Sequence, residues 1–210
     1  MIIYDFFAGT GSATKAFEEC GHTVIKVELD KQFQAQERDI LGLTADYLIT
    51  KYGKPDFIWA SPPCTTFSVA SIGKHWDLEK NPKTESAREG LALVAKTIEL
   101  IKQLNPTIGY IIENPRGMLR KQPLLGMPTW TVSYCQYGET RMKPTDLWSN
   151  LKQWQPKPIC KPKSSCHEPA PRGARTGTQG LKGSKIRSMI PYNLSCDVHH
   201  IVCDTPRSYA

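Results

Sequence analysis

The stretch IIYDFFAGTGSATKAFEECGHTVIKVEL, residues 2–29, decides the fold. It opens with a short apolar run that stops at a glycine (2–9), continues with a helical pattern (12–21) and ends with a second strand-like run (23–29). Two strands joined through a helix form the βαβ unit of a parallel sheet. We therefore expect an α/β protein with a doubly wound, mostly parallel sheet.

The rest of the first 150 residues continues the alternation of strand and helix patterns. Ser86 and Glu89 predict a capping box at the start of a long helix that packs one face on the sheet and ends near Asn105. A last helix is expected to begin near Pro191, because proline is tolerated in the first turn. The remaining strand-like runs are DFIWAS (56–61), TIGYIIEN (107–114) and a late, antiparallel pair, WTVSYCQYG (130–138) and TDLWSN (145–150).

Composition limits the class of protein. The 210 residues are 40% hydrophobic and 22% charged, without an apolar run long enough to cross a membrane. The N-terminus lacks the basic region of a signal peptide, so we expect a cytoplasmic protein. The seven cysteines are odd in number and scattered, which argues against a disulfide scaffold.

The positive charge is concentrated near the C-terminus. The net charge is +7, and the segment 141–187 alone holds eleven lysines and arginines against two acids. This asymmetry predicts a polyanionic partner, with a solvated charged surface as the alternative. Residues 151–187 are rich in Lys, Pro, Gly, Ser and Thr, so little regular structure is expected there. Trp148 and Trp154 are expected to anchor this segment to the core, with stacking on bases as the alternative.

Chemistry-bearing residues follow the predicted strands, and the carboxyl ends of parallel strands share one crevice. The glycine loop at 9–11 is not a dinucleotide fingerprint, because Thr14 stands where the third glycine would be. The loop suits a nucleoside-bearing or amino-acid-bearing cofactor, with Glu28 placed to accept hydrogen bonds from ribose hydroxyls. A tight turn and a solvated acid are the alternative.

Two further strand ends carry reactive groups. Cys64 follows two prolines that stiffen the backbone, so its thiol is a candidate nucleophile, with a small buried apolar side chain as the alternative. Glu113 ends an apolar strand, and desolvation would raise its pKa until it can donate a proton near neutrality. Pairing of Glu113 with Arg116 or Arg120 is the alternative.

Taken together, these motifs resemble the DNA cytosine-C5 methyltransferase family. The resemblance covers residues 3 to 148, and the short form, with KPTDLW (143–148) and APRGARTGTQG (170–180), is similar to the compact methylases of bacteriophages, which places the protein in a bacterial host cell. The matching stretches, in the family's order, are DFFAGTGSATKAF (5–17), VELD (27–30), LTADYLIT (43–50), SPPCTTFS (61–68), IIENP (111–115) and, more loosely, YCQYGETRMKPTDLW (134–148).

The resemblance implies a class I, Rossmann-like fold and S-adenosylmethionine as cofactor, with Glu28 on the ribose and Asp46 on the adenine amino group. It implies that Cys64 adds to C6 of a flipped cytosine while Glu113 protonates or hydrogen-bonds N3, before methyl transfer to C5 and release of the cysteine. The implied cofactor residues are Asp5, Phe6, Ala8, Gly9, Thr10, Gly11, Glu28, Leu29, Asp46 and Pro62.

The resemblance also implies a DNA partner, which we expect to be duplex, and a monomeric enzyme. The basic motif of the family is carried by Arg141 and Lys143, of which Arg141 is preferred as a catalytic residue because its fork makes two hydrogen bonds. The predicted substrate and DNA contacts are Pro63, Ser68, Asn114, Lys143, Arg172, Arg175, Lys182 and Lys185.

The domain organisation departs from the family. We expect a catalytic domain at 1–150, a reduced target-recognition segment at 151–187, and a C-terminal helix at 188–210 that packs back on the catalytic domain. The last motif of the family, a helix that closes the cofactor site, has no clear copy. IPYNLSCDVHHI (190–201) is expected to fill its position.

Three alternatives remain open. Ser61-Pro62-Pro63 resembles the motif of amino-methyltransferases acting on cytosine N4 or adenine N6, although Cys64 stands where that motif has an aromatic residue. A catalytically inactive DNA-binding relative is the second. The third is zinc, held by Cys160, Cys166 and His167 or by the Cys196, His199, His200, Cys203 stripe of the last helix. Neither group has a standard spacing, so no metal is predicted.

Overall fold

The computed structural model describes residues 1–169 and 183–207. Within them, six strands form one sheet in the order β2-β1-β3-β4-β6-β5. The first four pair in parallel, and β6 runs antiparallel to both β4 and β5, which confirms the doubly wound α/β fold and the late antiparallel pair. The strands are β1 (Ile2–Phe6), β2 (Thr23–Val27), β3 (Phe57–Ala60), β4 (Gly109–Pro115), β5 (Trp130–Ser133) and β6 (Pro144–Ser149).

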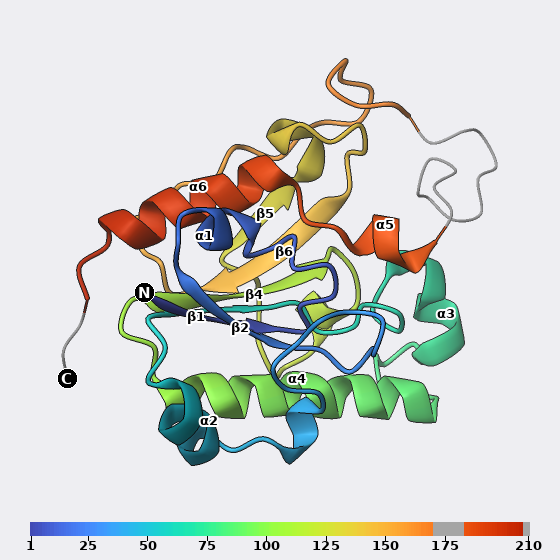
Figure 1. Ribbon diagram of the computed structural model, residues 1–210. Coiled ribbons are helices and arrows are strands. Elements are labelled where there is room, and N and C mark those ends of the chain that lie inside the picture. The colour runs from blue at the N-terminus through green and yellow to red at the C-terminus, as the bar shows by residue number, and fades with distance from the viewer. Residues whose placement is uncertain (170–182, 208–210) are drawn as a thin grey trace.

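Helices cover both faces of the sheet (Figure 1). On one face lie α2 (Ala45–Tyr52) and the long α4 (Glu85–Leu104), and on the other lie α1 (Lys15–Glu19) and α6 (Tyr192–Asp204). Two buried apolar clusters, one on each face, hold these layers together. The shorter helical elements are α3 (Ile72–His75), α5 (Ser184–Ser188) and the 3₁₀ turns η1 (Ile40–Gly42), η2 (Val69–Ser71), η3 (Leu119–Lys121) and η4 (Tyr134–Tyr137).

Some element boundaries differ from the sequence prediction. The N-cap of α4 is Thr84, whose hydroxyl accepts a hydrogen bond from the backbone N–H of Ala87 at 3.3 Å. The predicted capping box of Ser86 and Glu89 is therefore wrong, because the chain is already helical at Glu85. The run at 130–138 is a strand only to Ser133, after which the chain tightens into η4.

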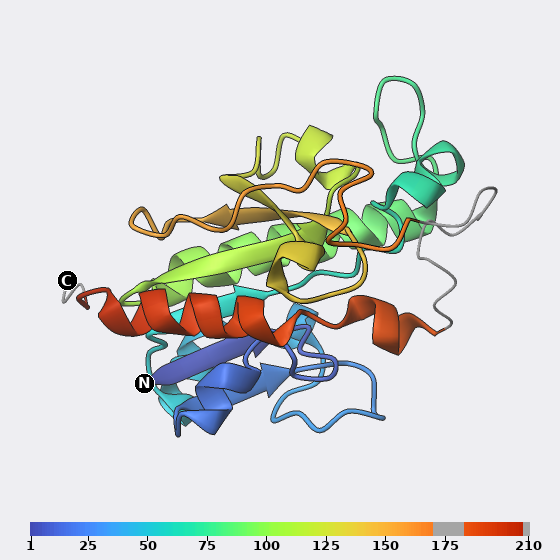
Figure 2. The same ribbon diagram turned by 90° about the horizontal axis from the view of Figure 1, so that it is seen from above.

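The C-terminal helix α6 begins directly after Pro191, as predicted, and packs against α1 (Figure 2). The buried Ser195 joins the two helices: its hydroxyl accepts from the backbone N–H of Ala16 at 3.1 Å and donates to the carbonyl of Ala13 at 2.8 Å. The indole N–H of Trp154 donates to Asp197 of the same helix at 3.1 Å. Trp154 and Trp148 are both buried, which confirms that they anchor this part of the chain to the core.

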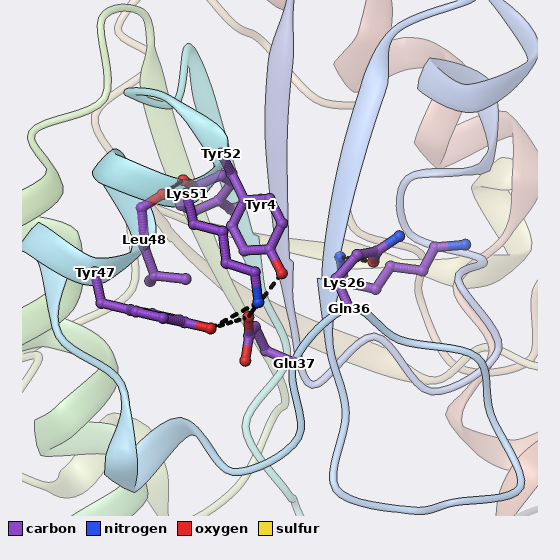
Figure 3. A network of polar contacts seen from close by, with 8 residues as sticks. All are labelled: Tyr4, Lys26, Gln36, Glu37, Tyr47, Leu48, Lys51 and Tyr52. Atoms are coloured by element: carbon purple, nitrogen blue, oxygen red, sulfur yellow. Dashed lines mark hydrogen bonds and ion pairs between the residues drawn. The ribbon is translucent and has the colours of Figure 1, made fainter.

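A polar network holds the loop after β2 against α2 (Figure 3). One oxygen of Glu37 accepts hydrogen bonds from Tyr52 at 2.7 Å, Lys51 at 2.8 Å and Tyr47 at 2.9 Å. These bonds lower the pKa of Glu37, although its partial burial alone would raise that pKa. The loop that begins at Glu28 is thereby fixed to the helix whose first turn carries Asp46. Within the part of the chain described here, no helix is both long and apolar enough to cross a membrane.

Candidate functional site

The candidate site lies at the carboxyl edge of the parallel strands, where the loops after β1, β2, β3 and β4 meet. The chain turns sharply in the loop after β1. Phe7, Gly9 and Gly11 have φ of 63°, 50° and 72°, in the left-handed region. The left-handed conformation favours glycine at position 11; a Cβ atom there would stand 2.7 Å from the Nζ of Lys26, the end of a flexible side chain that can move aside.

Glu28 joins the loops after β1 and β2. Its Oε2 accepts a hydrogen bond from the backbone N–H of Gly9 and its Oε1 one from Asp30, both at 2.8 Å. Glu28 therefore holds these two loops together, and its role in binding a cofactor stays a prediction. Each oxygen keeps a second lone pair for a further donor, such as a ribose hydroxyl.

Two buried side-chain atoms at this edge have no hydrogen-bond partner. Among the described residues, these are Oδ1 of Asp5 and Oδ1 of Asn114. The other oxygen of Asp5 accepts from Thr14 at 2.6 Å, and the amide of Asn114 donates to the carbonyl of Pro62 at 2.8 Å. Buried polar atoms are rarely left unpaired, and both of these belong to predicted site residues.

The other predicted cofactor residues lie around the same loops. Phe6 and Ala8 are buried, Leu29 is exposed over 69% of its surface, and Asp46 is exposed in the first turn of α2. Pro62 is buried and Thr10 partly exposed, each directly beyond its strand.

The loop that carries Cys64 is held firmly from both sides. The carbonyl of Cys64 accepts from the backbone N–H groups of Phe67 and Ser68, both at 3.0 Å. The carbonyl of Phe67 accepts from Met118 at 2.7 Å, and the Phe67 ring is fully buried. Cys64 itself remains partly exposed in this tight turn, and so does Ser68, while Pro63 is exposed.

Glu113 is buried at the end of β4, next to the strand that leads to Cys64. Burial raises the pKa of Glu113, while the nearby Lys143 and hydrogen bonds from Tyr134 and Ser61 oppose that rise. The phenol of Tyr134 donates to Oε1 of Glu113 at 3.0 Å. The pKa of Glu113 therefore lies above its ordinary value, in the direction that the sequence predicts.

The alternative pairing of Glu113 with Arg120 is wrong. The Arg120 guanidinium forms a two-pronged ion pair with Asp146 on β6, with nitrogen–oxygen distances of 2.6 and 2.8 Å. Asp146 is fully buried and also accepts a hydrogen bond from Thr131. Its ion pair with Arg120 leaves that arginine unavailable to Glu113.

Glu113 and Cys64 influence each other. Burial and the charge of Glu113 raise the pKa of the Cys64 thiol, and the cations Lys143 and Arg187 lower it. Lys143 thus acts on both reactive groups, and its own pKa is lowered by burial. Arg141 is engaged differently: its Nε lies 2.7 Å from Oε2 of Glu139. Of the two cations Lys143 and Arg187, Lys143 lowers the pKa of Cys64 more.

The predicted basic contacts fall on a segment that is only partly described. Arg172, Arg175 and Lys182 lie outside the described residues. Lys185 is exposed on α5, with its ammonium 5.3 Å from the centre of the Phe33 ring. In Figure 1, α5 lies at the same end of the molecule as α3, beyond the carboxyl ends of the strands.

Sequence reasoning missed some residues of the site. Tyr134 and Ser61 contact Glu113, and Arg187 lies close enough to affect Cys64. Tyr134 stands inside the loosely matching stretch 134–148, but neither its type nor its spacing indicates that it reaches a carboxylate 21 residues away.

Comparisons with known proteins agree with this geometry. The family model described as C-5 cytosine-specific DNA methylase matches residues 1–130. A "Probable DNA (cytosine-5)-methyltransferase" of Frog virus 3 (isolate Goorha) is 33% identical over 212 residues, covering 91% of this chain and 95% of the viral protein. The "Type II methyltransferase M.AplI" of Arthrospira platensis is 31% identical over 126 residues, which span 58% of this chain and 33% of that protein.

A solved structure also matches part of the chain. It is a mutant of DNMT2 from Spodoptera frugiperda, with 23% identity and a TM-score of 0.38, covering 59% of this chain and 38% of that one. The family model favours the C5 interpretation of the Ser61-Pro62-Pro63-Cys64 loop over the amino-methyltransferase alternative, since the matched residues include that loop.

Proposed function

The chain belongs to the C-5 cytosine-specific DNA methylase family and is a DNA cytosine-5 methyltransferase; from this premise we propose which of its residues carry the reaction. The observation that carries the proposal is the pairing of Cys64 with the buried Glu113 at the ends of neighbouring strands, with Lys143 beside both. Cytosine must be activated before C5 can accept a methyl group. This pair supplies a nucleophile and an acid in one crevice.

Cys64 is the nucleophile in this proposal. A thiolate that adds to C6 of the ring makes C5 electron-rich, and the protonated Glu113 donates to N3 as the ring gains charge. After methylation, loss of the C5 proton restores the double bond and releases Cys64. C6 is inaccessible inside a duplex, so the target nucleotide must leave the stack to reach Cys64.

Lys143 stabilises the thiolate and the charge that develops on the base. We assign this role to Lys143 rather than Arg141, because the charge of Lys143 acts on Cys64 and Glu113 while Arg141 is held by Glu139. Arg141 then positions the segment that carries Lys143 and leads into β6. The unpaired Oδ1 of Asn114 is an acceptor available to the base or to the loop.

The residues after β1 and β2 fit S-adenosylmethionine, which supplies the methyl group when bound. The unpaired Oδ1 of Asp5 is an acceptor for a cationic donor such as an ammonium group, and Glu28 has lone pairs left for ribose hydroxyls. We assign contacts with the nucleoside base to Leu29, which follows Glu28 and has an exposed apolar side chain, and to the carboxylate of Asp46 in the first turn of α2.

The partner is DNA, which we propose to be duplex, bound by a monomer through the basic segment at 151–187. The division into catalytic, recognition and C-terminal segments is part of the same proposal. We also propose a cytoplasmic location, a bacterial host, and roles in restriction and modification. The relative that covers almost the whole chain comes from Frog virus 3.

The deciding experiment incubates the purified protein with labelled S-adenosylmethionine and mixed-sequence duplex DNA, and identifies the methylated nucleoside by mass spectrometry. We expect 5-methylcytosine from the wild type and none from Cys64→Ala. Cys20→Ser is the matched control, because Cys20 is an exposed cysteine after α1. Transfer that survives in Cys64→Ala, or a product methylated on an amino group, would overturn the proposed roles.

A further inference from the structure

Three cysteines and one histidine converge away from Cys64, beside the turn η4. The side chains are those of Cys135, Cys160, Cys166 and His167, and their ligand atoms all lie within 4.8 Å of one another. The Sγ of Cys166 lies 3.1 Å from that of Cys160 and 3.7 Å from that of Cys135. Nδ1 of His167 lies 3.5 Å from the sulfur of Cys160 and 3.7 Å from that of Cys166.

These separations are close to those of a tetrahedral metal site. Zinc binds thiolate sulfur at about 2.3 Å and imidazole nitrogen at about 2.0 Å, so two ligand atoms on a tetrahedron stand roughly 3.8 Å apart. Three sulfurs and one imidazole nitrogen form one of the common donor sets of structural zinc. We propose that Cys135, Cys160, Cys166 and His167 bind one zinc ion.

The surroundings support a built site rather than a chance cluster. The backbone N–H of Cys160 donates to the hydroxyl of Ser133 at 2.9 Å, which holds Cys160 beside the end of β5. The side-chain amide of Gln136 donates to the sulfur of Cys166 at 3.5 Å. Hydrogen bonds of this kind orient metal-binding sulfurs and stabilise their negative charge. Cys135 and Cys160 are buried, so a bound ion would be shielded from water on that side.

A disulfide explains the cluster less well. A disulfide would join two of the three sulfurs. The third thiol and the imidazole would then lie beside the disulfide with no role. With four protein ligands, the site has no open position, which is the arrangement of a structural rather than a catalytic zinc.

The zinc would fix the segment that precedes the basic residues. Within 151–169 the structure has no helix or strand, and that segment buries few apolar side chains. The ion would tie residues 160–167 to η4, and the next residue, Glu168, donates its backbone N–H to the carbonyl of Thr140 at 2.8 Å. Thr140 directly precedes Arg141, so the site would also stabilise the segment that carries Lys143 and leads into β6.

A second group of possible ligands must be distinguished from this one. His22, His199 and Cys203 also lie together, with the two ring nitrogens 3.2 Å apart. Cys196 of the predicted stripe is not part of this group, and the rings of His22 and His199 pack against Phe17. This group offers only three ligands, and its rings pack against an aromatic side chain, so we interpret it as a packing contact of α6. Cys203 is therefore the matched control.

The test measures metal content by mass spectrometry on the full chain, expressed with zinc and purified without chelator. We expect one zinc per chain in the wild type and in Cys203→Ser, and loss of zinc in Cys160→Ser, Cys166→Ser and His167→Ala. His167→Cys should retain the metal, because four thiolates also form a closed zinc site. Zinc that persists in Cys160→Ser and is lost in Cys203→Ser would overturn the assignment.

A spectroscopic measurement on the wild type avoids variants that fail to fold. Cobalt exchanged into the protein should show the visible absorption of a tetrahedral, thiolate-bound ion, and added zinc should abolish it. Chelation should then increase proteolysis within 151–169. A wild-type protein that binds neither zinc nor cobalt, or one whose Cys160 and Cys166 are joined as a disulfide, would refute the proposal.

Discussion

The side-chain ammonium of Lys143 donates a hydrogen bond to the backbone carbonyl of Arg187 at 2.9 Å, which links the residue directly before β6 to the end of α5. Nη1 of Arg141 donates to the same carbonyl at 3.4 Å. The helix α5, which stands at the end of the basic segment, therefore contacts both cations of the family's basic motif. It also lies close enough for the Arg187 side chain to act on Cys64.

The reactivity of Cys64 should depend on Lys143. Lys143 lowers the pKa of the Cys64 thiol, so Lys143→Met should raise it further and slow alkylation of Cys64 by iodoacetamide at neutral pH, roughly tenfold per pKa unit. Peptide mapping of the alkylated protein measures this rate for each cysteine. Lys143→Arg should restore most of the rate, and the exposed Cys20 is the internal reference. An unchanged rate at Cys64 in Lys143→Met would show that its thiol does not sense this cation.

The pH dependence of catalysis should respond to Tyr134. Its phenol donates to Glu113 and lowers the pKa of that carboxyl group. In the proposed mechanism the protonated form of Glu113 donates to the base, so activity should fall as pH rises through the pKa of Glu113. Tyr134→Phe removes the hydrogen bond, so the alkaline limb of the kcat profile should move to higher pH. A lower kcat with the limb unmoved would mean that Tyr134 serves packing alone.

The strands were predictable from the sequence because an apolar run is a local signal. The residues that directly follow such a run, as Cys64 does, or end it, as Glu113 does, could be placed at the carboxyl edge of the sheet, and their catalytic roles stay a prediction. The choice between Arg141 and Lys143 could not be made from residue type, because both are basic. We base it on the effect of Lys143 on the pKa values of Cys64 and Glu113, and on the ion pair that Arg141 forms with Glu139 two residues away. Cys135 was missed because it joins Cys160 through the packing of η4 rather than through sequence spacing.

The buried Asp5 should make folding sensitive to pH. Burial raises the pKa of Asp5 to about 7, against the usual 3.8. Between about pH 4 and pH 7 the folded protein keeps this proton while the unfolded chain loses it, so stability falls as pH rises. The wild type should therefore lose up to about 4 kcal/mol across that interval relative to Asp5→Asn. Urea unfolding of both proteins at several pH values measures the difference, and parallel curves would contradict the prediction.

DNA binding should be strongly salt-dependent if the basic segment contacts phosphates. Lys185→Ala should weaken binding uniformly across sequences and reduce the slope of log Kd against log salt by about 1. The matched control is Lys102→Ala, which removes an exposed lysine from the last turn of α4, at the opposite edge of the sheet. Fluorescence anisotropy with labelled duplexes measures the slope. Equal slopes for wild type and Lys185→Ala would exclude Lys185 as a phosphate contact.

The loop of Cys64 should depend on the absence of a side chain at Gly117. A Cβ atom there would stand 2.2 Å from the carbonyl oxygen of Phe67, and backbone cannot move aside as a flexible side chain can. Gly117→Ala must therefore displace Phe67, whose N–H holds the carbonyl of Cys64.

We expect this substitution to destabilise the fold by about 1–3 kcal/mol, as overpacking does, and to lower kcat more than its effect on folding explains, because Cys64 moves with its loop. Gly42→Ala is the control, since no heavy atom lies within 4 Å of the Cβ it would add and its φ is outside the left-handed region. Urea unfolding and single-turnover methylation below the unfolding transition separate the two effects. Wild-type turnover in Gly117→Ala would show that the reaction tolerates displacement of the Cys64 loop.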